Sequence, residues 1–155
     1  MQITGQCHCG AITFKATVDP KKVLVCHCAD CQQISGGPFR AVLPTPVEDV
    51  ILSGTAKHYV KVAASGNRRA QAFCAECGTQ LYATEADVPT TLNLRLGCVN
   101  ERAHLAPHIQ MWGESAMPWL GQLQTVPVHA KGLTSPLMSP GAASAQAPPP
   151  TTAPR

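Results

Sequence analysis

Charged residues are scarce in this 155-residue chain, in which Asp, Glu, Lys and Arg together make up 14%. An average soluble domain has ~25%. The net charge is +3, and the basic residues are scattered apart from the doublets Lys21-Lys22 and Arg68-Arg69. A surface that binds nucleic acid usually shows a denser basic stripe or cluster. We therefore do not expect nucleic acid to be a partner.

Long apolar runs are also missing. No stretch approaches the ~18 apolar residues that a membrane helix needs. The first residues show no positively charged start followed by an apolar run, as a secretory signal would. These absences predict a cytoplasmic protein that does not contact a membrane. Aromatic residues are only 5% and hydrophobic residues 45%, so we expect one domain with a core of Val, Leu, Ile and Ala.

Apolar residues recur at every second position in residues 12–18 and again in residues 92–96. This period of two is typical of half-buried β-strands. No segment shows a convincing helical period. Pro44 and Pro46 are expected to end a further extended segment, residues 39–43, because proline lacks a backbone donor. The pattern predicts a mainly β fold with few or no helices.

The composition changes near the C-terminus, where Ser, Pro, Ala, Gly and Thr dominate from about Lys131 onward. Such a segment buries too little apolar surface to offset its chain entropy. We therefore expect a folded domain over residues 1–128 and a disordered Pro/Ala/Ser-rich tail over residues 129–155.

Cysteine is the residue type that is concentrated instead of scarce, since seven of the eight cysteines fall in three short stretches. In a reducing compartment, closely spaced cysteines indicate a metal site or catalysis more often than disulfides. Cysteines two apart on a strand point to the same face, so a Cys-x-Cys pair aims both sulfurs at one ion. The three stretches are Cys7-His8-Cys9, Cys26-His27-Cys28-Ala29-Asp30-Cys31 and Cys74-Ala75-Glu76-Cys77.

Two zinc ions per chain are the simplest interpretation, because zinc prefers four tetrahedral ligands. The two stretches with two cysteines each make one closed, structural site, from Cys7, Cys9, Cys74 and Cys77. The other stretch leaves three ligands, Cys26, Cys28 and Cys31. Three protein ligands with one open position are typical of a catalytic zinc site. The spacing leaves alternatives open, because Cys98 or a histidine could close the second site and both sites could be structural.

The order of these motifs resembles the glutathione-dependent formaldehyde-activating enzyme family, which also includes centromere protein V. The resemblance covers about residues 5–120. It rests on Cys7-x-Cys9-Gly10, on Cys26-x-Cys28-x-x-Cys31 followed by Gly36-Gly37-Pro38-Phe39, on Phe73-Cys74-x-x-Cys77-Gly78-Thr79, and on Pro107-His108-Ile109 and Pro118-Trp119.

The resemblance implies an antiparallel β-tent with zinc-ribbon-like cysteine knuckles. It also implies a structural zinc on the four-cysteine set and a catalytic zinc on Cys26, Cys28 and Cys31. The implied reaction is that of a carbon–sulfur lyase acting on a thiol–carbonyl adduct such as S-hydroxymethylglutathione, with glutathione and formaldehyde as the products. The alternative is a non-catalytic zinc module that binds another protein or nucleic acid.

Glutathione would need cationic partners for its two carboxylates, and the sequence shows no clustered set of them. Four scattered basic residues are candidates: Arg40, Lys57, Arg68 and Arg95. Among the histidines, His108 follows Pro107 in a matched segment and is a candidate acid–base, although a structural hydrogen-bonding role is the simpler interpretation. Cys98 is expected to be a buried apolar thiol.

Overall fold

The computed structural model describes residues 1–63 and 65–139, and in this part the chain has ten strands, one α-helix and six short 3-10 helices. The strands form two sheets in which every pairing is antiparallel except that of β10 with β3. The prediction of a mainly β, largely antiparallel fold with few helices is confirmed. No helix in the described ranges is long and apolar enough to cross a membrane.

The smaller sheet has three strands in the order β1-β2-β5. Its strands are β1 (Gln2–Gln6), β2 (Thr13–Thr17) and β5 (Val50–Ser53). Alternate residues of β2 are buried and exposed, as expected for a sheet with one face in the core and one face in water.

The larger sheet has seven strands in the order β10-β3-β4-β9-β8-β7-β6. Its strands are β3 (Leu24–Cys26), β4 (Arg40–Pro46), β6 (Lys57–Val62), β7 (Arg68–Phe73), β8 (Gln80–Glu85), β9 (Thr91–Arg95) and β10 (Ile109–Met111). The 3-10 helices are η1 (Pro20–Lys22), η2 (Val47–Asp49), η3 (Leu96–Cys98), η4 (Arg102–His104), η5 (Gly113–Ser115) and η6 (Leu120–Gln124).

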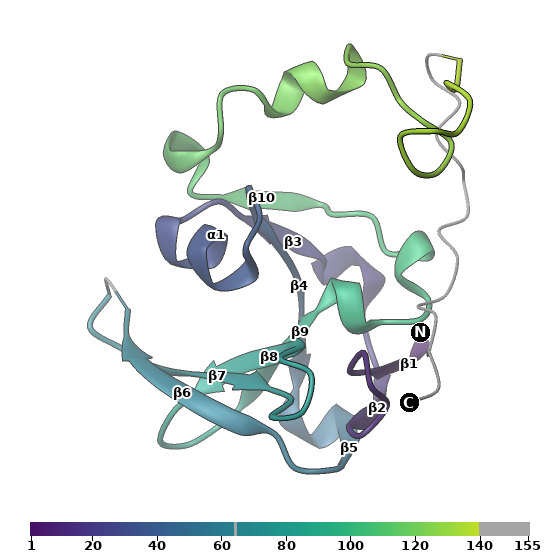
Figure 1. The fold of residues 1–155 in the computed structure, drawn as a ribbon. Coiled ribbons are helices and arrows are strands. Elements are labelled where there is room, and N and C mark those ends of the chain that lie inside the picture. The colour runs from purple at the N-terminus through teal and green to yellow at the C-terminus, as the bar shows by residue number, and fades with distance from the viewer. Residues whose placement is uncertain (64, 140–155) are drawn as a thin grey trace.

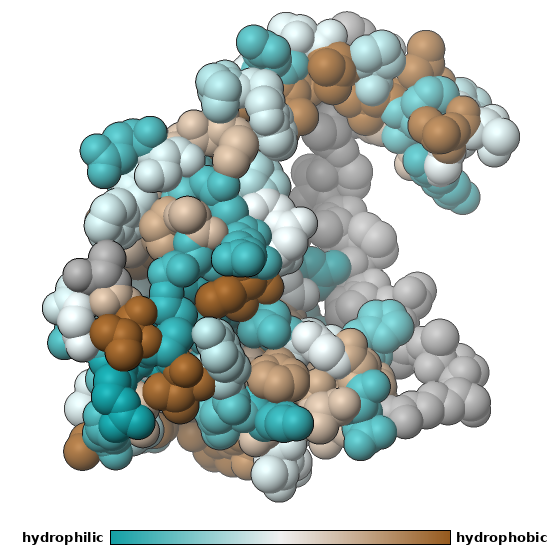
Figure 2. Space-filling model, turned by 60° about the vertical axis from the view of Figure 1, so that its left-hand side comes forward, coloured by the Kyte–Doolittle hydropathy of each residue, from teal (hydrophilic) through white to brown (hydrophobic). Residues whose placement is uncertain are grey.

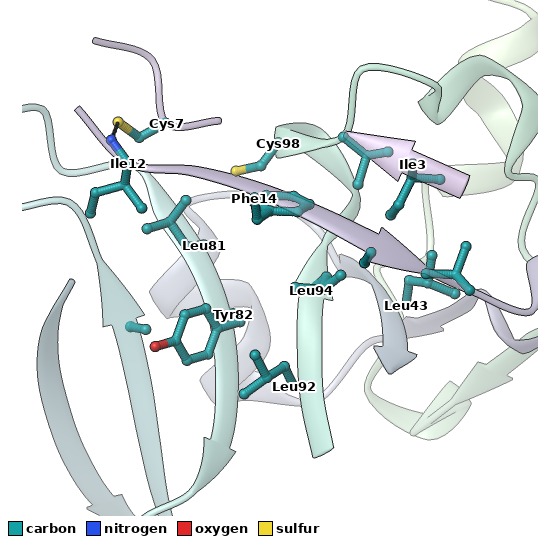
Figure 3. Close-up of a cluster of buried hydrophobic side chains, with 14 of the residues drawn as sticks. Ile3, Cys7, Ile12, Phe14, Leu43, Leu81, Tyr82, Leu92, Leu94 and Cys98 are labelled. Carbon is teal, nitrogen blue, oxygen red and sulfur yellow. Dashed lines mark hydrogen bonds between the residues drawn. The ribbon is translucent and has the colours of Figure 1, made fainter. Parts of the chain in front are cut away.

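Buried side chains from both sheets form one hydrophobic cluster. Figure 3 shows Phe14 of β2 among Leu81 and Leu94 of the larger sheet, with Cys98 close by. Leu81 and Leu94 have no exposed surface, and burying each such side chain is worth about 1.5–3 kcal/mol. The core fixes the smaller sheet against the larger one and so places the first cysteine loop beside the β7–β8 turn.

The larger sheet curves, so that β6 and β7 face the single helix α1 (Ala29–Ser35) across a gap (Figure 1). The helix begins directly after Cys28 and ends at Gly36, which has a φ of 66° and whose N–H donates to the carbonyl of Gln32. Glycine adopts this left-handed conformation without a Cβ penalty. Seven residues are too short for a helical period to be visible in the sequence, which is why no helix was expected there.

Strand β4 continues through Pro44 and ends at Pro46, so the prediction that the extended segment stops at residue 43 is wrong. Beyond Val42, the pairing of β4 with β3 has ended and the strand pairs with β9 alone. A strand that is paired on one side only can point the donor-less nitrogen of proline toward its open side.

The chain after β10 forms an arm that arches away from the two sheets (Figure 1), and hydrophobic residues are visible along it (Figure 2). Within the predicted tail, residues 129–139 make local contacts, such as the bridge between His129 and Leu137. Residues 140–155 of that predicted tail lie outside the described residues.

Candidate functional site

The first cysteine cluster joins the loop after β1 to the turn between β7 and β8. The sulfurs of Cys7, Cys9, Cys74 and Cys77 all lie within 4.8 Å of one another. Cys7 and Cys74 are buried, whereas Cys9 and Cys77 are half-buried. The glycines Gly10 and Gly78 have φ angles of 78° and 71°, which lets each loop turn tightly around its cysteine pair.

Thr79 links the two halves of this cluster. Its hydroxyl oxygen accepts a hydrogen bond from the backbone N–H of His8 at 3.0 Å and lies 3.1 Å from the sulfur of Cys77. Burial alone would raise the pKa of Cys77, but hydrogen bonds from the hydroxyl and backbone amide of Thr79 outweigh this effect and lower the pKa to about 6. A thiolate is therefore favoured at Cys77 near neutral pH, as a metal ligand requires.

The second cluster lies at the junction of β3 and α1. Cys26 ends the strand, Cys28 precedes the helix and Cys31 lies in its first turn, with their sulfurs within 4.8 Å of one another. Cys26 and Cys31 are buried and Cys28 is half-buried. Burial raises the pKa of the Cys31 thiol, and the positive charge of Arg40 opposes this shift. A thiolate at Cys31 therefore needs a cation beside it.

Both clusters fit a tetrahedral zinc ion in the spacing of their sulfurs. With zinc–sulfur bonds of ~2.3 Å, two sulfurs at neighbouring corners of a tetrahedron are about 3.8 Å apart. The observed separations are 3.5 Å for Cys7 and Cys9, 3.7 Å for Cys9 and Cys74, and 3.5 Å for Cys26 and Cys28. Both groups could therefore hold a metal ion. Among the described residues, neither group includes Cys98 or a histidine.

The three-cysteine cluster opens on a cavity of about 190 Å³ that lies between α1 and the curved sheet. The cavity wall also carries four cationic side chains and one carboxylate. These are Arg40 of β4, Lys61 of β6, Arg69 of β7, Arg95 of β9 and Asp30 of α1. Of the four basic candidates from the sequence, Arg40 and Arg95 line the cavity, whereas Lys57 and Arg68 do not.

Lys61 and Arg69 were missed as candidates because their position depends on the curvature of the sheet. The two residues are direct partners in the β6–β7 ladder, so their side chains share one face. In the sequence they belong to an exposed-looking basic hairpin that itself carries no cysteine. Each forms an ion pair at the cavity, Lys61 with Asp30 and Arg69 with Glu85.

Neither His108 nor Cys98 contributes a ligand atom to either cluster. His108 lines a different cavity together with His27, whose ring nitrogen Nε2 is 2.8 Å from Oε1 of Gln110. Cys98 is buried, as expected, and its thiol donates to the carbonyl oxygen of Gln80 at 3.0 Å. Burial raises the pKa of Cys98 to about 11, which keeps this thiol protonated.

Fold and site together define a class: a mainly β protein with two cysteine clusters that could bind metal, one of which opens on a cationic cavity. The family model described as glutathione-dependent formaldehyde-activating enzyme matches residues 2–115. This match covers well over half of the chain, and the chain belongs to that family.

Two known proteins are similar to this chain. A protein of Schizosaccharomyces pombe that is described as an uncharacterized lyase is 35% identical over 78 residues, which are 50% of this chain and 54% of the relative. The chain thus spans about half the length of the curated relative that it matches. A crystal structure of a Rhodobacter sphaeroides protein superposes with a TM-score of 0.53 at 17% identity, over 70% of this chain and 99% of the other, a likeness that concerns the fold alone.

Proposed function

We propose that this chain is a zinc-dependent carbon–sulfur lyase that acts on a thiol–carbonyl adduct such as S-hydroxymethylglutathione. The observation that carries the proposal is that Cys26, Cys28 and Cys31 share one cavity with four cationic side chains. A cluster with three sulfurs leaves one tetrahedral position for a substrate atom. Membership of the family and the description of the relative as a lyase support the same reaction class.

The two clusters have different roles in this proposal. Cys7, Cys9, Cys74 and Cys77 hold a structural ion that fastens the β1–β2 loop to the β7–β8 turn. Cys26, Cys28 and Cys31 hold the catalytic ion. When bound there, zinc supplies a Lewis acid that polarises a carbonyl oxygen and keeps a thiol deprotonated near neutral pH. These thiols must stay reduced, which is the condition of the cytoplasm, and we place the reaction there.

The chemical step interconverts a hydroxymethyl thioether with a thiol and an aldehyde. In the cleavage direction the carbon–sulfur bond breaks, the hydroxyl oxygen becomes the carbonyl oxygen and its proton ends on sulfur. Negative charge develops on that oxygen during the step. The cationic side chains that line the cavity favour this charge by electrostatic attraction.

The assay is exchange NMR on an equilibrium mixture of glutathione, ¹³C-labelled formaldehyde and their adduct, with the zinc-loaded chain added. We expect the exchange rate between free aldehyde and adduct to rise in proportion to the wild-type protein. The Cys28→Ser variant is the control and should keep its fold, contain one zinc ion fewer and give no acceleration. Exchange that the wild type does not accelerate, or that both proteins accelerate equally, would contradict the proposal.

A further inference from the structure

Two arginines at the base of the cavity share one acceptor. Nη1 of Arg40 donates to Oε1 of Gln71 at 3.1 Å, and Nη2 of Arg95 donates to the same oxygen at 2.7 Å. Arg95 has only 5% of its surface exposed. Two guanidinium groups are thus held side by side with a single neutral oxygen between them.

Several donors of these arginines have no partner. Nε and Nη1 of Arg95 and Nε of Arg40 are buried and make no hydrogen bond to any described residue. All nine Asp and Glu residues of the sequence lie in the described ranges, and no ion pair between described residues involves Arg40 or Arg95. An uncompensated buried charge is strongly unfavourable, so this pair is arranged for an anion from outside the chain.

Arg95 remains charged at neutral pH. Burial lowers the pKa of Arg95 to about 9, and the neighbouring charge of Arg40 adds to this shift. A value of about 9 still leaves the guanidinium protonated at pH 7. The cavity therefore keeps the positive charge of Arg95 under the conditions in which the proposed reaction runs.

A charge count distinguishes an anion site from simple compensation of the thiolates. Lys61 and Arg69 are each neutralised by a carboxylate, Asp30 and Glu85 respectively. Three thiolates with one divalent ion carry a charge of −1, whereas Arg40 and Arg95 carry +2. One net positive charge is left over as long as no thiolate occupies the open position, which matches one monoanionic group.

The size of the cavity limits what this anion can be. A cavity of about 190 Å³ is smaller than the ~300–1,000 Å³ of a pocket that encloses a drug-sized ligand. A small group such as a carboxylate with its neighbouring carbons fits, whereas most of a peptide-sized ligand would lie outside the cavity.

We propose that Arg40 and Arg95 anchor a carboxylate of the substrate, so that the lyase acts on adducts that carry a carboxylate. This inference rests on the proposed function. Arginine is suited to the task because its planar fork matches the two oxygens of a carboxylate. The carboxylate can belong either to the thiol, as in glutathione, or to the carbonyl compound, as in a 2-oxo acid.

Thermal unfolding of the zinc-loaded full chain tests the anchor with unreactive ligands. For a carboxylate on the thiol, the pair is S-methylglutathione and its diethyl ester, neither of which has a free thiol that could remove zinc. For a carboxylate on the carbonyl compound, the pair is glycolate and glycolamide. We expect the carboxylate member of one pair to raise the Tm and its ester or amide partner to leave the Tm unchanged, which identifies the source of the carboxylate.

Three variants show whether the arginines cause the difference. Arg95→Met and Arg40→Met should each abolish the shift, and Arg95→Met should have a higher Tm than the wild type without ligand, because it removes a buried charge. Arg68→Gln is the matched control, since Arg68 pairs with Asp87 at the surface, and it should keep the shift. The inference is overturned if no charged ligand raises the Tm or if the methionine variants keep the shift.

The exchange assay separates this inference from the proposed function. If the protein accelerates adduct exchange but no carboxylate ligand shifts its Tm, the carboxylate anchor is wrong and the proposed lyase activity stands. If a carboxylate ligand shifts the Tm through Arg40 and Arg95 but the protein does not accelerate adduct exchange, the proposed lyase activity is wrong and the cavity is an anion-binding site.

Discussion

Lys61 forms an ion pair with Asp30 across the cavity that both residues line. Lys61 lies on β6 at the edge of the seven-stranded sheet, and Asp30 lies in the first turn of α1, next to Cys31. The pair therefore connects the segment that carries the second cysteine cluster to a strand that is distant in the sheet.

Replacing Lys61 by Met should loosen the three-cysteine cluster without unfolding the chain. Asp30 is half exposed, and such an ion pair contributes only ~0.2–1 kcal/mol to stability. We expect the free energy of unfolding, measured in urea, to fall by that amount. We also expect faster release of one zinc ion to a chelator. Arg68→Met breaks a comparable surface pair with Asp87 and serves as control. Equal release rates in the two variants would show that the Lys61–Asp30 pair does not support the cluster.

Cys77→Ser should unfold or aggregate the chain, because Cys77 belongs to the cluster that joins the two sheets and structural zinc sites supply folding free energy. Circular dichroism and zinc content per chain measure the outcome. Cys98→Ala is the matched control, because Cys98 is a buried cysteine outside both clusters, and it should keep its fold and both ions. A soluble, folded Cys77→Ser protein would count against the four-cysteine assignment.

Glu85 should stabilise the fold in a pH-dependent way. Burial would raise its pKa, but the backbone N–H groups of Thr90 and Thr91 and the guanidinium of Arg69 lower it from 4.5 to about 2. A carboxyl with a lowered folded-state pKa contributes stability that is complete above its unfolded pKa, near 4.5, and is lost as the pH falls toward 2.

The comparison that shows this contribution is the wild type against Glu85→Gln in urea unfolding. We expect the wild type to be more stable by a constant amount between pH 7 and pH 5, and the difference to shrink below about pH 4.5 for as long as the fold persists. Acid release of zinc affects both proteins and cancels. A difference that shrinks already between pH 8 and 6 would point to a group other than Glu85.

Removing residues 129–155 should leave the zinc content and the Tm unchanged. The described part of this segment makes local hydrogen bonds, such as those from Ala130 to Pro136 and from Met138 to Val128, and we propose that residues 1–128 form the complete zinc-binding unit. Zinc analysis and thermal unfolding of the truncated chain check this. Loss of a zinc ion or a large fall in Tm would place part of this segment in the domain.

The sequence was most informative where the chemistry is local. The second cysteine cluster lies within six residues of sequence, Cys26 to Cys31, so it was predictable. The strands β2 and β9 were also predictable, because an apolar residue at every second position defines the buried face of each strand. The cationic cavity was not, because Lys61 and Arg69 reach it only through the curvature of the sheet. The sequence also did not reveal that β4 continues through Pro44. Proline is tolerated there because β4 no longer pairs with β3 beyond Val42.

The zinc content of the wild-type chain, before and after incubation with glutathione, tests the two-site assignment most directly. We predict two zinc ions per chain after purification under reducing conditions, falling toward one in glutathione, because a thiol can reach the open position at Cys26, Cys28 and Cys31 but not the closed cluster. Two ions that both resist glutathione would contradict an open site and would favour a zinc module without catalysis.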